Sequence, residues 1–538
     1  MQPLVDNMVV KRYAIEGISV TSARLESRTG ALTRQKHGTS APVVACDLGA
    51  TSGRVFAGWF DDAGFRCTEV HRFSNRARMV GGELRWDVDG LWDGIRTGIS
   101  AARGRGRGTI QSVAVDAWGV DFALLDRGRH LLGNPVSYRD ARTRDMVTEA
   151  IGRVDERELF AATGNQTLAI NTLVQLLAMA TTGDPALGAA DLLLTIPDLF
   201  HHWLCGSEVV ERTNATTTEC FDQSIGSWAF ELLDRFDIPR HIFPPVVEPG
   251  TILGTLAGGR LSEHGQAAVV APAAHDTASA VAAAPGRPGT AFVSAGSWTL
   301  VGVERSAPTT VEGALLAGLT NEGGVGGQTL LLSVIPGFWL LELSREAWRR
   351  IGDNRELDEL LVAAARAEPL RSLFDPNDPS LLDAVDVPAV IRTICRSRGQ
   401  PEPTEPGEIT RAILESLALK AAEAVASIES VTGERITTIR VIGGGSRNRL
   451  YCQWVADASG REVVAGPAEA AALGNLAVQA AALGLVGSLA DARRIVSDAV
   501  RPEIFEPDQD ERWLAATERF AVMSTRRPNR EQSREVLT

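Results

Sequence analysis

An acidic residue stands at the end of the first strongly apolar segment of the chain, directly before a polar turn. Residues 43–60 read VVACDLGATSGRVFAGWF, which predicts a strand, a short turn and a second strand. Small residues in such a turn expose backbone N–H groups, and these form a cradle for phosphate oxygens. Asp47 would then hold a hydrated Mg²⁺ that bridges carboxylate and phosphates. On this segment alone, a plain hairpin in which Asp47 caps its own turn is the simpler interpretation.

A second segment of the same kind lies about half a chain away. Residues 290–304 read TAFVSAGSWTLVGVE, again a strand, a turn of Gly and hydroxyl residues, and a strand. In the turn of the earlier segment, residues 43–60, Thr51 and Ser52 add hydroxyl donors and Arg54 adds a positive charge. Two such turns in related domains would clamp a polyphosphate between them. A chance match of two β-hairpins accounts for the likeness equally well.

A further acid stands where a helix is expected to begin. In PAAHDTASA, residues 272–280, Asp276 follows a strand and a turn. A carboxylate at this position caps free N–H groups of the helix and is favoured by the helix dipole. The functional alternative is a general base that faces a cleft and accepts a proton from a substrate hydroxyl during phosphoryl transfer. His275 and Thr277 either bond the same substrate or fill space.

Three glycine-containing turns complete the set of candidate sites. VIGGGSRN, residues 441–448, places three glycines between a strand and a helix whose N-terminus suits an anion or a nucleotide. It matches neither the P-loop nor the G-x-G-x-x-G pattern, and a simple connection explains it as well. In DAWGVDFALLD, Gly119 would let a sugar approach the backbone and Asp121 would bond its hydroxyls. LTNEGGVGGQ offers Asn321 and Glu322 in a polar loop.

Composition limits the classes of function. The chain has 538 residues, 44% of them hydrophobic, which favours two large domains. The net charge of −13 argues against sequence-independent nucleic-acid binding. No window approaches the length of apolar chain that a membrane span needs, and we expect no secretory signal. The six cysteines contain no C-x-x-C pair, which suits reduced thiols in the cytoplasm.

The elements that must position these residues alternate between strands and helices. Short apolar runs are followed by segments with helical spacing, such as residues 407–433, which end on Gly433. This alternation predicts an α/β architecture with buried strands.

Taken together, these segments resemble the FGGY family of carbohydrate kinases, and within it the branch that acts on L-rhamnulose. The resemblance runs from about residue 43 to about residue 482. It is carried by DLGATSGRV, WDVDGLW, VDAWGVDFALLD, GNPVSYRDART, TGNQTLAINTLVQLLA, TNATTTECFD, HDTASAV, SAGSWTLVGVE, TNEGG and IGGGSRN. Of these phrases, WGVDFALLD with YRDART, and TNEGG, are specific to that branch.

The resemblance implies two ribonuclease-H-like domains of the actin-like ATPase type with a cleft between them. It also implies MgATP and a small ketose as ligands, with transfer of the γ-phosphoryl group to the C1 hydroxyl of L-rhamnulose in rhamnose catabolism. We expect residues 41–285 to form the sugar-side domain and residues 286–505 the nucleotide-side domain. Residues 1–40 are expected to be a flexible extension and residues 506–538 a charged tail.

The resemblance also implies roles for individual residues. Asp276 is implied to be the catalytic base, and Asp47 remains the expected metal ligand. The implied sugar contacts are Gly119, His275, Asp276, Thr277 and Asn321. The implied ATP contacts are Ala50, Thr51, Ser52, Gly53, Arg54, Ser297, Gln328 and Gly444, with Gly444 on the adenine side.

Other functions fit the same segments. One is a kinase for another ketose or polyol, such as L-fuculose, xylulose or the autoinducer-2 precursor. Another is a nucleotide-dependent switch on the same fold that hydrolyses ATP and transfers nothing. A sugar-binding module without catalysis is hard to reconcile with two turns of the phosphate type.

Overall fold

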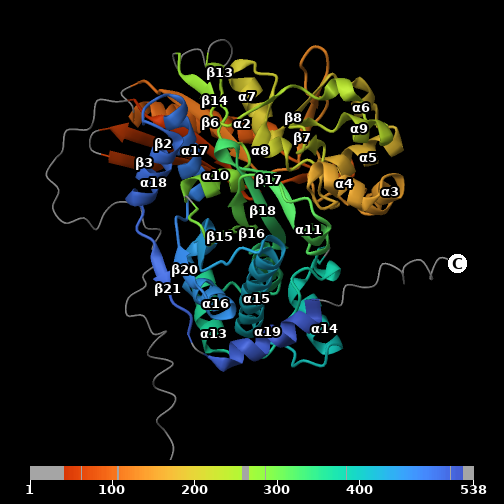
Figure 1. Ribbon diagram of the computed structural model, residues 1–538, viewed down its shortest axis with the longest axis vertical. Helices are drawn as coiled ribbons and strands as arrows, with labels where there is room; N and C mark the ends of the chain where they lie inside the picture. Colours follow the sequence, from red (N-terminus) through yellow and green to blue (C-terminus); the bar gives the residue numbers. More distant parts are fainter. Residues whose placement is uncertain are drawn as a thin grey trace, which may run out of the picture.

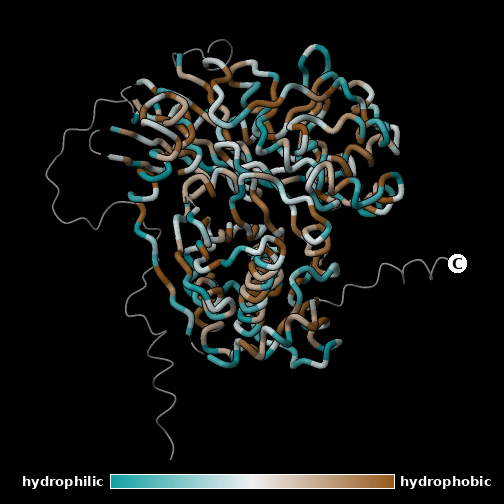
Figure 2. The backbone as a smooth tube through the Cα atoms, viewed as in Figure 1, coloured by the Kyte–Doolittle hydropathy of each residue, from teal (hydrophilic) through white to brown (hydrophobic). Residues whose placement is uncertain are grey.

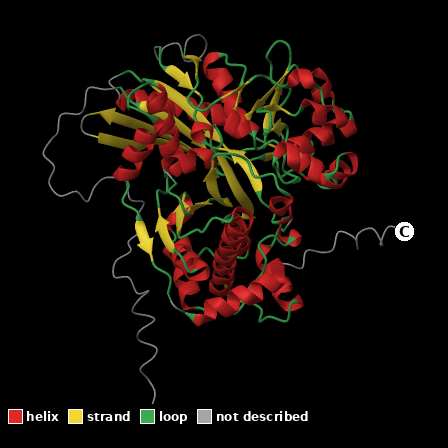
Figure 3. Cartoon of the chain, viewed as in Figure 1, coloured by secondary structure: helices red, strands yellow, loops and turns green. Residues whose placement is uncertain are grey.

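Two β-sheets, one in each half of the chain, form the framework of the protein (Figure 1). The computed structural model describes residues 41–524, apart from 62–63, 106–107, 257–265, 285, 383 and 509. The expected extension, residues 1–40, and the end of the expected tail, residues 525–538, lie outside these ranges. Helices flank the strands of both halves (Figure 3).

The first sheet is mixed, and its two central strands are buried along their whole length. β1 and β6 are parallel and fully buried, which is typical of parallel strands covered on both faces. The order across this sheet is β13 (Ile252–Thr255), β14 (Ala268–Val270), β6 (Ser112–Ala117), β1 (Val43–Leu48), β2 (Ser52–Asp61) and β3 (Gly64–Ser74).

The second sheet has seven strands, and β15 lies at its centre. Its order is β17 (Thr320–Gly323), β18 (Thr329–Pro336), β16 (Trp298–Arg305), β15 (Thr290–Ala295), β19 (Thr438–Ile442), β20 (Glu462–Ala465) and β21 (Glu503–Phe505). Apart from β17, it repeats the first sheet strand for strand. In both sheets two antiparallel pairs are followed by two parallel pairs and one antiparallel pair.

This repetition confirms that the two hairpins noticed in the sequence are structurally equivalent. β1 and β2 occupy the same places in the first sheet as β15 and β16 in the second. The fold is therefore the α/β fold of two related domains that was expected. Hydrophobic residues gather inside both halves and hydrophilic residues on the outer loops (Figure 2).

Two helices pack closely at the junction of the halves. α10 (Asp276–Ala283) ends the first half, and α17 (Ala470–Ala482) comes from the second. A Cβ added to Gly474 would lie 1.7 Å from the carbonyl oxygen of Ser279, so only glycine permits this approach. α17 also buries Leu476 against Val43 in β1. The two halves therefore contact each other through a closely packed helix pair.

The segment expected to be a charged tail contains a packed helix. α19 (Glu511–Ser524) buries Trp513, Ala516, Phe520 and Met523 in the core of the second half. These apolar residues recur at helical spacing, and their burial keeps the segment on the domain. No helix among the described residues is long and apolar enough to cross a membrane.

Candidate active site

Three carboxylates lie at the C-terminal ends of neighbouring strands of the first sheet. Asp47 in β1 and Asp116 in β6 stand opposite each other in the parallel register. One residue further on, Ala117 pairs with His275, which directly precedes Asp276 at the start of α10. Asp47 and Asp116 are buried, whereas the side chain of Asp276 is 32% exposed. Asp276 is therefore the carboxylate of this group that a substrate can reach.

Burial raises the pKa of all three carboxyls. The pKa of Asp116 lies well above its ordinary value, first because of burial and then because of the charge of Asp47. Burial also raises the pKa of Asp47, against the opposing effect of Arg54, whose Nη2 donates to Oδ2 at 2.5 Å. For Asp276, burial raises the pKa and the neighbouring His275 lowers it. A raised pKa makes a carboxylate a better proton acceptor.

The surroundings of Asp116 fit a cation bound close by. Its Oδ2 accepts a hydrogen bond from Nδ2 of Asn475 at 2.6 Å, while its buried Oδ1 has no partner among the described residues. The described ranges contain no cluster of three or more His, Cys, Asp or Glu side chains arranged to hold a metal by themselves. Mg²⁺ requires no such cluster, because it commonly binds one or two carboxylates together with waters and substrate phosphates. Asp47, with Asp116 beside it, meets that requirement.

The first expected phosphate loop is an ordered turn between β1 and β2. The N–H of Gly49 donates to the carbonyl of Ser52 at 3.0 Å, and Nδ2 of Asn75 donates to the carbonyl of Gly49 at 2.8 Å. Thr51 is exposed and Ala50 half-buried, so both face outward from the strand ends. Gly53 is required by packing, because a Cβ there would lie 2.3 Å from the Phe73 ring.

The second expected phosphate turn and the glycine turn lie at one end of the second sheet. Ser297 connects β15 to β16, and Gly444 follows β19, which is parallel to β15. A Cβ on Gly445 would lie 2.5 Å from that of Ala295, so the two turns touch. A Cβ on Gly444, in contrast, would meet nothing within 4 Å. The structure thus brings Ser297 and Gly444 together and leaves space beside Gly444.

Gln328 does not lie with these residues. It precedes β18, whose first residue, Thr329, pairs with Arg305 at the end of β16. The other end of the same strand pair joins Pro336 to Trp298, next to Ser297. Gln328 therefore lies at the opposite end of the sheet from the Ser297 turn, and its expected contact with ATP stays a prediction.

The histidine before Asp276 contacts a carboxylate from the other half of the chain. Oε2 of Glu322 in β17 lies 3.2 Å from Nδ1 of His275, and Nε2 of His275 lies 3.5 Å from Oδ1 of Asp276. Both His275 and Glu322 are buried. Burial alone would lower the pKa of His275, but the carboxylates, Glu322 first, outweigh it and raise that pKa. The hydroxyl of Thr277 donates a hydrogen bond to Oδ1 of Asp276 at 3.2 Å.

Asn321, the neighbour of Glu322, has a structural role in this arrangement. Its Oδ1 accepts the N–H of Thr309 at 2.7 Å, and its Nδ2 donates to the carbonyls of Gly164 and Thr309 at 2.9 and 3.1 Å. The fully buried amide thus has backbone partners on both atoms. A sugar contact by Asn321 stays a prediction, whereas Glu322 is the residue of this strand that reaches His275.

Both carboxylate oxygens of Asp121 accept hydrogen bonds from neighbouring side chains. Its Oδ2 accepts the indole N–H groups of Trp86 and Trp118 at 2.6 and 2.9 Å, and its Oδ1 accepts Nε2 of Gln175 at 3.1 Å. Burial raises its pKa to about 6 against these hydrogen bonds. The expectation that Asp121 bonds sugar hydroxyls is not supported, because its oxygens are occupied and buried.

The turn that carries Gly119 holds a strained residue that the sequence did not reveal. Val120 has a φ of 66°, an outlier for a β-branched residue. Its N–H donates to Oγ1 of Thr217 at 3.1 Å, and its carbonyl accepts the hydroxyl of Thr172 at 2.6 Å. A Cβ on Gly119 would lie 2.7 Å from the same Oγ1 of Thr217. Such strain, worth about 1–3 kcal/mol, gathers at functional sites.

The two halves of the chain match the two domains of one family of sugar-phosphorylating enzymes. Residues 43–283 match the N-terminal domain, and residues 291–483 the C-terminal domain, of the FGGY family of carbohydrate kinases. The chain belongs to this family. It is 38% identical over 475 residues to a rhamnulokinase of Bacteroides thetaiotaomicron, with 88% of this chain and 97% of the relative covered. A rhamnulokinase of Halalkalibacterium halodurans is 37% identical over 457 residues, with 85% and 97% covered.

Solved structures of more distant kinases share the fold. A ligand-bound xylulose kinase from Lactobacillus acidophilus superposes with a TM-score of 0.73 at 15% identity, covering 90% of this chain and 97% of that one. A Plasmodium falciparum glycerol kinase with ADP gives a TM-score of 0.72 at 16% identity, covering 91% and 99%. At this identity the likeness establishes the architecture alone.

Proposed function

We propose that the protein transfers the γ-phosphoryl group of ATP to the C1 hydroxyl of L-rhamnulose, forming L-rhamnulose 1-phosphate and ADP. The choice of sugar is supported by the rhamnulokinases of 37–38% identity that align over 97% of their own length. The observation that carries the chemistry is the position of Asp276. It is the one partly exposed carboxylate of the three at the strand ends.

In the proposed reaction, Asp276 is the general base. Its carboxylate accepts the proton of the C1 hydroxyl while that oxygen attacks the γ-phosphorus in line, and the bond to the β–γ bridging oxygen breaks to release ADP. The raised pKa of Asp276 suits proton acceptance, and the nearby His275 limits that rise. His275 and Thr277 are assigned to orient the sugar beside Asp276, and the small Gly119 lets the sugar approach the backbone.

The phosphate groups of ATP are assigned to the paired turns. Backbone N–H groups of residues 50–53 and the hydroxyl of Ser297 donate to phosphate oxygens from the two halves. Arg54, beside Asp47, supplies positive charge close to the phosphates. The open space at Gly444 suits the adenine side. Asp47 would hold Mg²⁺, which neutralises charge on the phosphates when bound.

We place the reaction in the cytoplasm, where ATP is available and thiols stay reduced. All six cysteines are free thiols, and burial raises the pKa of Cys46, Cys220 and Cys452, which keeps them unreactive.

A substrate panel tests the proposal. ADP release is measured with L-rhamnulose, L-fuculose, xylulose and the autoinducer-2 precursor, and each product is identified by mass spectrometry. We expect the highest kcat/KM with L-rhamnulose and one phosphosugar formed per ADP. A higher kcat/KM with another ketose would reassign the substrate. ADP release without any phosphosugar would favour the non-transferring ATPase switch.

A further inference from the structure

A hollow of about 760 Å³ lies where the two halves of the chain join, away from the carboxylate edge. Its walls come from the end of α10, the linker 286–290, the first residues of β15, and α18 (Leu489–Ala499). Thr290, at the start of β15, lines this hollow, whereas the Ser297 turn follows the other end of the strand. Six strand residues span about 20 Å. The hollow is therefore a separate site from the expected nucleotide turns.

Positive charge dominates its lining. The charged residues in its wall are Arg287, Arg435, Arg440, Arg493, Glu304 and Glu434. Both carboxylates already have arginine partners. Oε1 and Oε2 of Glu304 accept hydrogen bonds from Nη2 of Arg493 at 2.9 and 3.0 Å. Oε1 of Glu434 accepts a hydrogen bond from Nη1 of Arg305 at 2.7 Å. A surplus of arginine in one hollow is notable in a chain with a net charge of −13.

Arg440 lacks a counterion. Its buried Nε has no hydrogen-bond partner, and within the described ranges no ion pair to Arg440 or to Arg287 is formed. Burial lowers the pKa of Arg440, and the charges of Arg287 and Arg493 lower it further. Leaving a buried donor unpaired is costly, and so is placing like charges together. A bound anion would pair with the free donor and offset the like charges.

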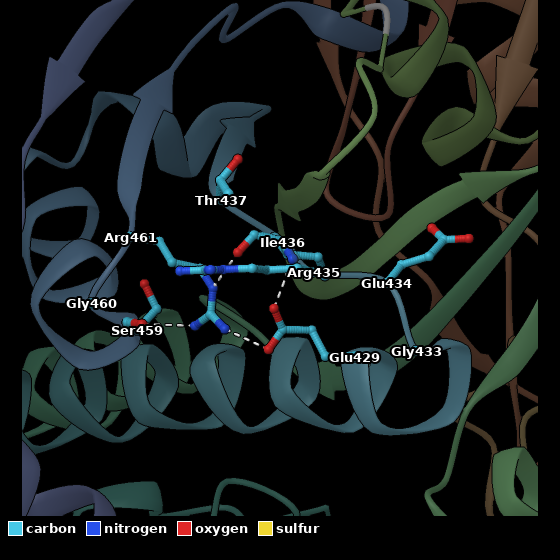
Figure 4. Close-up of a pocket in the computed structure, with 9 residues that line it drawn as sticks. All are labelled: Glu429, Gly433, Glu434, Arg435, Ile436, Thr437, Ser459, Gly460 and Arg461. Atoms are coloured by element: carbon cyan, nitrogen blue, oxygen red, sulfur yellow. Dashed lines mark hydrogen bonds and ion pairs between the residues drawn. The ribbon is translucent and has the colours of Figure 1, made fainter.

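The neighbouring groove gives a contrast within the same region (Figure 4). There Arg461 donates to the carboxylate of Glu429 at 2.6 Å and to the carbonyls of Ile436 and Ser459 at 2.9 and 2.7 Å. Each of the three nitrogens of its guanidinium therefore has a protein partner. The groove and the hollow share Ile436 in their walls, and on the hollow side Nε of Arg440 has no hydrogen-bond partner among the described residues.

We propose that the hollow bounded by Arg287, Arg440 and Arg493 binds a small molecule that carries a phosphate group. A guanidinium fork pairs with phosphate oxygens through parallel N–H···O bonds, and the volume accommodates a metabolite of sugar-phosphate size. Arg287 belongs to the linker between the matched domains, and Arg440 to β19 of the second domain. The bound anion connects the linker to the second domain.

Inorganic phosphate is the probe for the test. Its affinity for the full chain is measured by calorimetry, alongside melting temperature with and without phosphate. For the unaltered protein we expect binding and a rise in melting temperature. Arg440→Gln is expected to weaken binding about tenfold or more, because a charge-assisted bond is lost. Without phosphate, the melting temperature of Arg440→Gln is expected to rise, since the repulsion and the unpaired donor are removed.

Two further variants make the result decisive. Arg287→Gln changes an exposed linker residue, so it is expected to fold normally and to weaken phosphate binding. It therefore tests the proposal even if Arg440→Gln folds poorly. Arg54→Gln, in the expected phosphate loop of the cleft, is expected to keep phosphate binding at the hollow. The proposal is overturned if the unaltered chain does not bind phosphate, or if Arg287→Gln and Arg440→Gln both bind it as tightly as the unaltered chain. Loss of binding in Arg54→Gln alone would assign the phosphate to the cleft and overturn it as well.

Discussion

Oε2 of Glu322 lies 3.2 Å from Nδ1 of His275, and this contact joins the second half of the chain to the residue beside the expected catalytic base. Nε2 of the same imidazole lies 3.5 Å from Oδ1 of Asp276. The three groups form a line of carboxylate, imidazole and carboxylate. A charged imidazole in the middle lowers the pKa of Asp276 and so favours its ionised form.

This line predicts the effect of Glu322→Gln on the pH profile. Removing the carboxylate lowers the pKa of His275, so the ring becomes neutral at a lower pH and stabilises ionised Asp276 less. The acid limb of kcat/KM is expected to move to higher pH by about one unit, the scale of a lost charge at this distance. Steady-state kinetics from pH 5 to 9 measures it. Glu368→Gln, at an exposed carboxylate, serves as control. An acid limb that stays in place in Glu322→Gln would remove Glu322 from the line.

The helix pair at the junction predicts a stability effect. Gly474→Ala places a methyl group 1.7 Å from the carbonyl oxygen of Ser279, so α17 must move away from α10. Overpacking of this kind costs about 1–3 kcal/mol. Thermal unfolding is expected to begin at a lower temperature by several degrees, and kcat to fall because α10 starts with Asp276.

A second glycine variant controls for the loss of glycine itself. Gly152 lies within α3 (Met146–Arg153), and a Cβ there meets nothing within 4 Å. Gly152→Ala is expected to leave the melting temperature unchanged or raise it, since alanine favours a helix over glycine by about 0.5–1 kcal/mol. Equal melting temperatures for Gly474→Ala and Gly152→Ala would show that the two helices are not tightly packed.

A buried carboxyl that is not one of the three at the strand ends predicts how stability changes with pH. Glu219 is fully buried, and burial raises its pKa to about 8 although Thr167 and Asn171 donate to its oxygens. Its pKa in the unfolded chain is the ordinary 4.5, so between these values the folded state binds more protons than the unfolded state. Stability contributed by this group is therefore lost as the pH rises from about 4.5 to 8, by at most about 1.4 kcal/mol per unit.

Glu219→Gln tests this relation directly. Glutamine copies the neutral carboxyl and does not ionise, so the variant is expected to lose less stability between pH 5 and pH 8 than the unaltered protein. Melting temperatures across that interval measure the difference. Parallel curves for the two proteins would mean that Glu219 does not titrate in this range.

The sequence predicted the sheets well because their signal is local. β1 and β15 are apolar runs that end in small-residue turns, and this pattern needs no knowledge of distant contacts. The helix expected over residues 407–433 matches α15 (Pro406–Thr432), which Gly433 ends with a φ of 70°. In both cases the residue types alone determine the element.

The choice between Asn321 and Glu322 could not be made from the sequence. Neighbouring residues of a strand point to opposite faces, and a one-residue error exchanges them. Both faces of β17 are buried, so hydrophobic alternation gives no guide to which residue faces His275. The contact depends on how the two halves meet, and no local pattern encodes that.

The positions of Gln328 and α19 could not be predicted from the sequence for the same reason. The position of Gln328 depends on the pairing of β16 with β18, which places it at the end of the sheet remote from Ser297. The charged residues after 505 suggested a tail, but the apolar side chains between them, such as Trp513 and Phe520, are buried against the second domain. Partners far away in the sequence decided both outcomes.

The turnover of Asp276→Asn with L-rhamnulose and MgATP tests whether Asp276 is the general base. Asparagine keeps the size and the position of the side chain at the start of α10 but cannot accept the proton. Phosphosugar formation is measured by mass spectrometry together with ADP release, and a melting curve confirms folding. We expect kcat to fall by a factor of about 10² or more. A variant that folds normally and turns over at nearly the original rate would contradict it.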